Sequence, residues 1–291
     1  MANSLEKSQK YLDLIIELYR KGSLTAGLET SAVRFDPIDA NVIKMLRITS
    51  TGLGDYTRNV GYPKGDVTAA WDSYTLAVDR GARFGLDRLD EEEVLALTIG
   101  ALAGQWTRDN MIPELDAFRF AKFAGEAGTL VDGTLAAATM LAAIDAAAVK
   151  LNNAEVPDMG DRLLFINQDL ELEMRQALTR GGLANEALIN TRIESYNGMK
   201  VVYVPSARFN EILTLNPGTG GSWGFTGSGK PINFMLLDPK AVWVVTRAAN
   251  GKFITANENQ ALDSNEFMFR ICHDAGAIKG REIGIYAHLR A

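Results

Sequence analysis

A glycine-rich segment near residue 225 carries residue types that could bind a phosphate group. Residues 224–231 read Gly-Phe-Thr-Gly-Ser-Gly-Lys-Pro, close to the G-x-x-x-x-G-K-[ST] pattern of nucleotide-binding loops. Pro231 stands where such a loop needs a hydroxyl for Mg²⁺, and residues 232–237 have the composition of a strand, not of the helix that would face the phosphate. Residues 216–230 are therefore predicted to form a flexible surface loop, with nucleotide binding as the alternative.

The other reactive side chains match no catalytic or metal-binding pattern. His273 lies between Asp274 and Cys272, the single cysteine. Adjacent strand residues point to opposite faces, so Cys272 and His273 would diverge, whereas zinc needs three or four convergent ligands and a nucleophilic pair needs hydrogen-bond contact. A structural or solvent-facing role is predicted for His273. The sequence predicts no catalytic residue, no metal site and no cofactor.

Carboxylates cluster in two other places, and neither cluster predicts a catalytic or metal-binding site. The three glutamates at residues 91–93 suit the first turn of a helix, where negative charge is favourable. Glu114 and Asp116 could be a catalytic pair, but residues two apart on a helix do not share a face. We predict ion pairs instead, formed with Arg119 or with a neighbouring subunit.

The composition and net charge of the chain limit the classes of partner that it is expected to bind. The chain has 291 residues, of which 47% are hydrophobic and 23% charged, as in ordinary globular proteins with a sizeable core. A net charge of -6 does not favour binding to a phosphate backbone. The single cysteine excludes an intrachain disulfide and is compatible with a reducing compartment. No apolar run reaches membrane-spanning length and no signal peptide is visible, so we expect no membrane association.

A strand pattern changes abruptly into a long helix pattern between residues 71 and 127. Apolar and polar residues alternate from Tyr74 to Leu86, which predicts a strand with one covered face. From Asp90 the period becomes 3.6, and a helix continuing to Ala127 would measure roughly 55 Å. Pro113 predicts a kink or break. An extended protomer of this kind suits assembly better than an enclosed active site.

The segment before this helix predicts a long β-hairpin. Strand patterns at residues 43–49 and 71–86 flank a glycine-rich tip at residues 52–66. An isolated hairpin is marginally stable in water, so it should lean on something else, and a neighbouring subunit is one candidate. A predicted amphipathic helix at residues 5–20 packs either on its own core or on a neighbour. The residues predicted to contact neighbouring subunits are Arg58, Tyr62, Lys64, Trp71, Glu114 and Arg119.

Beyond residue 130 the patterns mix helices and strands with no strict βαβ repeat, which predicts an α+β protein. Helices are predicted at residues 134–152 and 168–178. Strands are predicted at residues 161–166, 199–205, 232–237, 241–246, 266–272 and 283–289.

Four strings carry a resemblance to a known family. Residues 78–87 contain Asp-Arg-Gly followed by Phe84, and residues 111–124 contain Pro-Glu-Leu-Asp-Ala-Phe-Arg. Residues 198–205, followed by Arg208, and residues 269–287 are similar too. Together they resemble the major capsid proteins of tailed bacteriophages, which have the Hong Kong 97 type of capsid fold.

The resemblance implies a division of the chain and a function. It implies an N-terminal arm at 1–40, an extended hairpin loop at 41–88, the spine helix of a peripheral domain at 89–129, an axial domain at 130–240 and returning strands at 241–291. It implies a homo-oligomer of hexamers and pentamers, assembled in the host cytoplasm into an icosahedral virion shell. The shell would enclose double-stranded DNA without sequence-specific binding, with possible scaffolding, portal and decoration proteins.

Alternatives to a viral shell remain open at this stage. One is an encapsulin-like nanocompartment with the same fold. Another is a nucleotide-binding protein that uses residues 224–230. A third is a soluble binding module or assembly factor that stays small.

Overall fold

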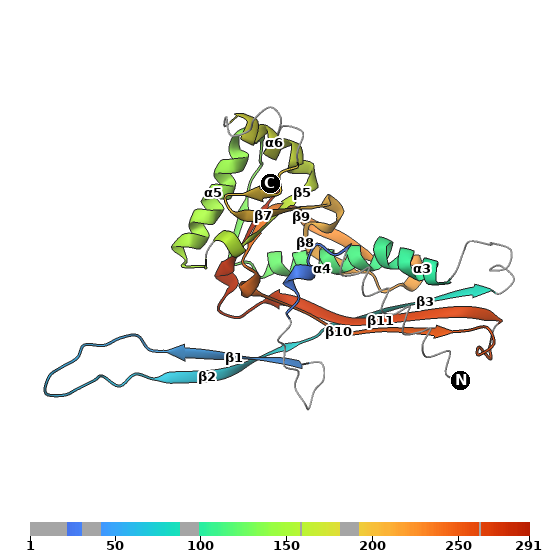
Figure 1. Ribbon diagram of the computed structural model, residues 1–291, viewed down its shortest axis with the longest axis horizontal. Coiled ribbons are helices and arrows are strands. Elements are labelled where there is room, and N and C mark those ends of the chain that lie inside the picture. Colours follow the sequence, from blue (N-terminus) through green and yellow to red (C-terminus); the bar gives the residue numbers. More distant parts are fainter. Residues whose placement is uncertain (1–21, 31–41, 88–98, 158, 181–191, 262) are drawn as a thin grey trace.

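The protein is elongated, with a two-stranded hairpin projecting from a body made of a sheet layer, a helix layer and a second α/β unit (Figure 1). The computed structural model describes residues 22–30, 42–87, 99–157, 159–180, 192–261 and 263–291. Its helices and strands follow no regular alternation, so the predicted α+β class is confirmed. None of the described helices combines the length and apolar composition that crossing a bilayer requires.

The sheet layer of the body is three-stranded and antiparallel, in the order β10–β11–β3 (Figure 1). In β3 the even-numbered side chains from Arg80 to Leu86 are partly buried and the odd-numbered ones exposed, so the predicted alternation is confirmed. The covered face contacts the helix layer through aromatic and aliphatic side chains of β11, including Phe269 and Ile271. The strands are β3 (Val78–Asp87), β10 (Val242–Ile254) and β11 (Ser264–Ala277).

The helix layer consists of α3 (Ile99–Trp106), a π-helical turn η2 (Thr107–Met111) and α4 (Ile112–Gly125), which follow one another above the sheet (Figure 1). Pro113 lies in the first turn of α4, where its missing N–H costs no hydrogen bond. The predicted interruption therefore takes the form of a π-helical turn, since the backbone on both sides of it stays helical. The predicted helix start at Asp90 lies outside the described residues.

The second unit is built on a sheet in the order β4–β12–β9–β5–β7–β6, with β8 paired to β9 outside that path. Phe165, Met235 and their neighbours on one face pack against Phe120 and Phe123 of α4. Alternate residues of the same strands pack against α5 and α6 on the other face. The elements are β4 (Thr129–Asp132), α5 (Ala137–Asn153), β5 (Leu163–Asn167), α6 (Glu171–Arg180), β6 (Ser195–Tyr196), β7 (Met199–Val204), β8 (Asn210–Leu215), β9 (Phe225–Leu237) and β12 (Ile285–Leu289).

The projecting hairpin pairs β1 (Val42–Ser50) with β2 (Val67–Thr75) in an antiparallel ladder. The predicted hairpin is thus confirmed, with its tip at residues 51–66. Its predicted second strand is two strands, because the chain breaks at Leu76, which is buried, and continues as β3 in the body sheet. The hairpin is therefore shorter than the segment 41–88 implied by the resemblance.

Candidate assembly surface

One face of the hairpin carries a row of exposed apolar side chains. The register places Leu46 opposite Trp71, and Val67 opposite Ser50, so the even positions of β1 and the odd positions of β2 share this face. We call Leu46, Ile48, Val67 and Trp71 the apolar stripe; they are 49%, 63%, 72% and 57% exposed. Contiguous exposed apolar surface of this kind marks an interaction site.

The opposite face of the hairpin is anchored to the body at its base. Ile43 is fully buried in a cluster with Trp243 and Val245 of β10, and the ring of Tyr74 lies 5.1 Å from that of Trp243. The Tyr74 hydroxyl also accepts a hydrogen bond from the backbone N–H of Lys279, at 3.0 Å. The base is therefore held by the chain's own core, while the outer part extends away from it (Figure 1).

An ion pair lies between the anchored base and the free part of the hairpin. Arg47 Nε is 2.8 Å from Asp72 Oδ2, and Lys279 Nζ of the body is 3.7 Å from Asp72 Oδ1. Asp72 thus links Arg47 of the neighbouring strand to Lys279 of the body. Because Arg47 and Lys279 are exposed to solvent, these ion pairs add little stability.

The tip of the hairpin has internal structure although it carries no regular strands. The rings of Tyr56 and Tyr62 lie 5.1 Å apart, and Thr57 and Gly61 form an isolated β-bridge. Gly61 has φ +88°, a conformation that side chains other than glycine rarely adopt. Leu53 stands fully exposed. The tip therefore leaves aromatic and aliphatic side chains exposed to solvent.

Four of the six predicted assembly residues lie exposed on this hairpin, namely Arg58, Tyr62, Lys64 and Trp71. Their contact with a neighbouring subunit stays a prediction. The sequence reasoning missed Leu46, Ile48, Val67 and Leu53. The register of β1 with β2 would have identified the first three, since they fall on the face of Trp71.

The other two predicted assembly residues lie on α4 in the body. Arg119 is fully buried, and its guanidinium contacts Thr25, Glu29 and Thr246 of its own chain. The expectation that Arg119 contacts a neighbouring subunit is therefore wrong, because its face of the helix is turned into the protomer. Glu114 is mostly buried and pairs with Arg80, with Nε and Oε1 2.8 Å apart.

A buried carboxylate on α4, that of Asp116, ties the N-terminal segment to this helix. Asp116 accepts hydrogen bonds from Ser23 Oγ at 2.6 Å, from the Leu24 N–H at 3.0 Å and from Thr25 Oγ1 at 2.7 Å. Arg208 lies 3.5 Å from the same carboxylate. The described part of the predicted N-terminal arm, residues 22–30, thus packs on its own chain. The predicted helix at residues 5–20 lies outside the described residues.

The glycine-rich segment does not form a phosphate-binding loop. Residues 225–230 are the first half of strand β9, paired with β8, and a strand continues where a P-loop would begin a helix. Lys230 forms an ion pair with Asp132. The prediction of a flexible loop over residues 216–230 is wrong from Phe225 onward, because pairing with β8 supplies the order that glycine-rich composition does not.

Cys272 and His273 diverge as predicted. Cys272 packs in the hairpin-anchoring cluster, and His273 lies on the other face with its ring 5.2 Å from that of Phe118. His273 is buried and so is not solvent-facing. Burial and the nearby Arg119 and Arg80 lower the pKa of His273 to about 3. Within the described part of the chain, no three His, Cys, Asp or Glu side chains are grouped to hold a metal ion.

Comparison with solved structures identifies the fold. The chain is similar to one titled "Capsid structure of the Cyanophage P-SCSP1u", with TM-score 0.66 and 12% identity over 91% of this chain and 86% of that one. It is also similar to one titled "Asymmetric unit of bacteriophage PhiM1 mature capsid", with TM-score 0.64 and 11% identity over 86% and 82% of the two chains. A virus-like particle from Pyrococcus furiosus matches with TM-score 0.52 and 11% identity over 97% and 99%.

These matches define the class of fold. The chain has the Hong Kong 97 type of capsid fold, and the resemblance to tailed-phage major capsid proteins is confirmed at the level of that fold. No model of a known protein family matches the chain, and no curated protein matches it by sequence.

Proposed function

We propose that this protein is the structural subunit of a closed shell that it builds with copies of itself. The observation that carries the proposal is the apolar stripe on a hairpin that projects from a capsid-type fold. A two-stranded hairpin is marginally stable in water, and burying each large apolar side chain contributes up to about 1.5–3 kcal/mol. In a shell, a neighbouring copy would bury these side chains, and the same contact would recur at every subunit.

The finer arrangement follows from the resemblance and forms part of the proposal. The hairpin belongs to the extended loop at 41–88, and α3 and α4 belong to the spine helix of a peripheral domain at 89–129. Residues 130–240 form the axial domain, residues 241–291 the returning strands of the peripheral domain, and residues 1–40 the arm. Subunits form hexamers and pentamers of an icosahedral virion shell around double-stranded DNA, assembled in the host cytoplasm with scaffolding, portal or decoration proteins. The net charge of -6 suits a shell that encloses DNA without binding it tightly. The role is not enzymatic.

A nanocompartment that encloses protein cargo is the second candidate. It is favoured by the likeness to the virus-like particle from Pyrococcus furiosus, which covers nearly all of both chains. The absorbance ratio at 260 and 280 nm of purified particles separates the two functions. Nuclease-protected DNA supports a virion shell, whereas nucleic-acid-free particles with a co-purifying protein support a nanocompartment.

Electron microscopy and size-exclusion chromatography of the expressed protein test the proposal. We expect shells, tubes, hexamers or pentamers for the native chain, and none for Trp71→Asp, which puts a charge into the apolar stripe. Thr68→Asp is the matched control, because it adds the same charge to an exposed position on the other face of the same strand. A native protein that stays monomeric at high concentration would instead indicate a small binding module or assembly factor.

A further inference from the structure

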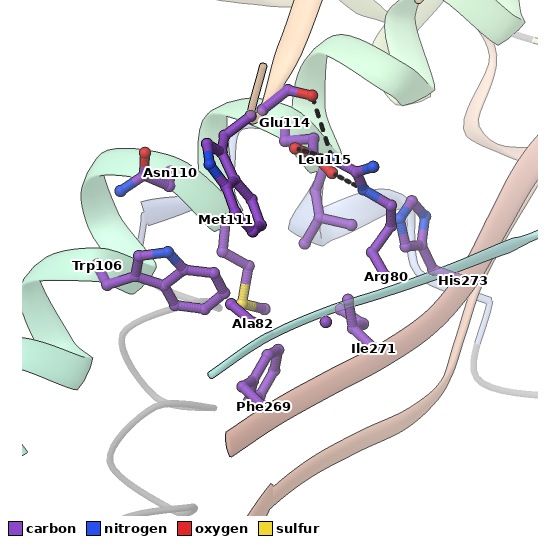
Figure 2. A pocket seen from close by; sticks show the side chains of 13 residues that line it. Arg80, Ala82, Trp106, Asn110, Met111, Glu114, Leu115, Phe269, Ile271 and His273 are labelled. Atoms are coloured by element: carbon purple, nitrogen blue, oxygen red, sulfur yellow. Dashed lines mark hydrogen bonds and ion pairs between the residues drawn. The ribbon is translucent and has the colours of Figure 1, made fainter. Parts of the chain in front are cut away.

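A half-enclosed pocket lies where three parts of the body meet. The helix layer contributes Trp106 and Met111, the sheet contributes Phe269 and Ile271 of β11, and the connection between β8 and β9 contributes Trp223. Figure 2 shows the apolar side chains of helix and sheet facing one another across it. The cavity measures about 100 Å³. Part of its wall is the π-helical turn η2, and such turns occur frequently at functional sites.

The outer wall of the pocket is a tryptophan on a glycine-rich turn. Trp223 lines the cavity and yet is 70% exposed, so it stands at the mouth. Its ring packs on Gly218, where a Cβ atom would come within 2.7 Å of the ring. The ends of the turn are fixed, because Asn216 N–H bonds the Gly224 carbonyl at 2.9 Å. The turn can therefore present Trp223 at the mouth without loosening the strands behind it.

The charged groups at the pocket cancel one another. Arg80 binds Glu114 through two hydrogen bonds, from Nε to Oε1 at 2.8 Å and from Nη2 to Oε2 at 3.1 Å. Its remaining donors reach the carbonyl oxygens of Asn216 at 2.6 Å and Gly224 at 3.1 Å. Because the guanidinium is matched in charge and in hydrogen bonds, the site offers nothing to an ionic ligand.

One polar group of the pocket lacks a partner. His273 is 1% exposed, and its Nδ1 has no hydrogen-bond partner among the described residues. The imidazole stays neutral at physiological pH, since burial and the nearby Arg119 and Arg80 hold its pKa low. A neutral imidazole can both donate and accept a hydrogen bond. An unpaired buried polar group is unfavourable, so a ligand that pairs with it gains affinity.

We propose that this pocket binds a small uncharged molecule made of one ring and one hydroxyl group. The ring lies against the apolar side chains that line the cavity, and the hydroxyl bonds the imidazole of His273, which lines it too. An apolar cavity of about 150 Å³ holds benzene. This cavity is smaller, at about 100 Å³, but it opens to solvent beside Trp223, so one ring can occupy it with an edge at the mouth. The bound molecule would join the helix layer, β11 and the β8–β9 connection and stabilise their packing. This inference does not depend on the proposed shell function.

Phenol is the probe that tests this site. Titration of the full-length protein with phenol, followed by tryptophan fluorescence and by the unfolding midpoint, should show saturable binding in the millimolar range. Toluene has the ring without the hydroxyl and should bind about tenfold more weakly. Ala82→Leu, at a half-buried position that lines the pocket, should fill it and weaken phenol binding about tenfold. Ala70→Leu, half-buried in β2 and outside the pocket, should leave binding unchanged.

Three results would overturn the inference. They are absence of saturable phenol binding, equal binding to the Ala82→Leu protein, and equal affinity for toluene. If Ala82→Leu does not fold, Trp223→Ala takes its place with Trp71→Ala as the control, since both tryptophans are exposed and only Trp223 lines the cavity. Binding that is unchanged in Trp223→Ala also contradicts the proposal.

Discussion

The hairpin leaves an apolar strand face exposed, whereas the sheet that contains β5 and β9 has such a face buried under α4. Both contain antiparallel pairs with an apolar face, β1 with β2 in the hairpin and β5 with β9 in the body. In the body, Phe165 and Met235 are fully buried because α4 lies over their face. In the hairpin, Ile48 and Trp71 are more than half exposed. The difference shows that an apolar strand face indicates a surface to be covered and leaves open whether the cover comes from the same chain.

The polar groups repeat this contrast. Asp116 and Arg119 are fully buried in the body, and the hydrogen bonds described for them come from the same chain. The hairpin pair Arg47–Asp72 is partly solvated. Removing one member of a buried pair leaves an uncompensated charge, whereas removing one member of an exposed pair leaves a hydrated one. The body should therefore be sensitive in stability, and the hairpin in assembly.

The largest effect expected is the loss of assembly when the hairpin tip is removed. Deletion of residues 52–66 should abolish shell formation, because the exposed aromatic and aliphatic side chains of the tip are lost while the anchored base keeps its core contacts. The free energy of unfolding should change by less than about 0.5 kcal/mol. Electron microscopy and denaturant unfolding measure the two quantities. Normal shells from the deleted protein would break the comparison.

The second-largest expected effect is a loss of folding stability caused by a substitution in the core of the body. Phe120→Ala should reduce the free energy of unfolding by about 3–5 kcal/mol, because it leaves a cavity beside Phe165 and Phe209. Ile48→Ala in the hairpin is the counterpart and should cost less than about 0.5 kcal/mol. Urea unfolding of both variants gives the two losses in unfolding free energy. The comparison requires that this free energy depends on urea concentration with the same slope in both variants. Similar losses at the two positions would mean that the hairpin stripe is covered within the protomer.

The buried carboxylate gives a somewhat smaller effect. Asp116→Asn should cost about 3 kcal/mol, since it removes the buried negative charge that pairs with Arg208. Asp72→Asn in the hairpin removes a carboxylate charge whose partners Arg47 and Lys279 are exposed, and it should cost about 1 kcal/mol or less. Chemical unfolding at two salt concentrations sharpens the test. We expect the Asp72 effect to be screened by salt and the Asp116 effect to persist.

The smallest effect expected is a loss of stability in mild acid. His273 has its pKa lowered from 6.5 to about 3, so between these values the unfolded chain binds a proton that the folded chain does not. Stability from this group is complete above pH 6.5 and falls as the pH drops, by about 1 kcal/mol between pH 7 and pH 5.5. His288, whose pKa is also lowered by burial, acts in the same direction.

His273→Asn provides the control for this dependence on pH. It removes the titrating group, so the difference in unfolding free energy between pH 7 and pH 5.5 should shrink by about 1 kcal/mol. Urea unfolding of both proteins at each pH measures this difference. An unchanged difference would show that His273 is protonated in the folded protein.

Local patterns predicted the elements whose signals lie within a few residues. The alternation in β3, the hairpin pair and the alanine-rich helix α5 were all predicted, since period and turn composition act locally. The interruption near Pro113 was also predicted, although its form as a π-helical turn was not. The candidate surface was predicted in part, because exposure of Arg58, Tyr62, Lys64 and Trp71 follows from their place on a hairpin.

The remaining features depend on partners that are distant in the sequence. The glycine-rich start of β9 is ordered because β8 lies beside it, and Arg119 is buried because Thr25 and Thr246 reach it from far along the chain. Such pairing cannot be read from composition, since the same residues in an unpaired segment would form a solvated loop or surface. By itself the sequence determined which segments have one apolar face and which positions are charged. Only the tertiary structure decided which of those faces the chain covers itself, and it left the hairpin uncovered because no element of the described protomer reaches that far.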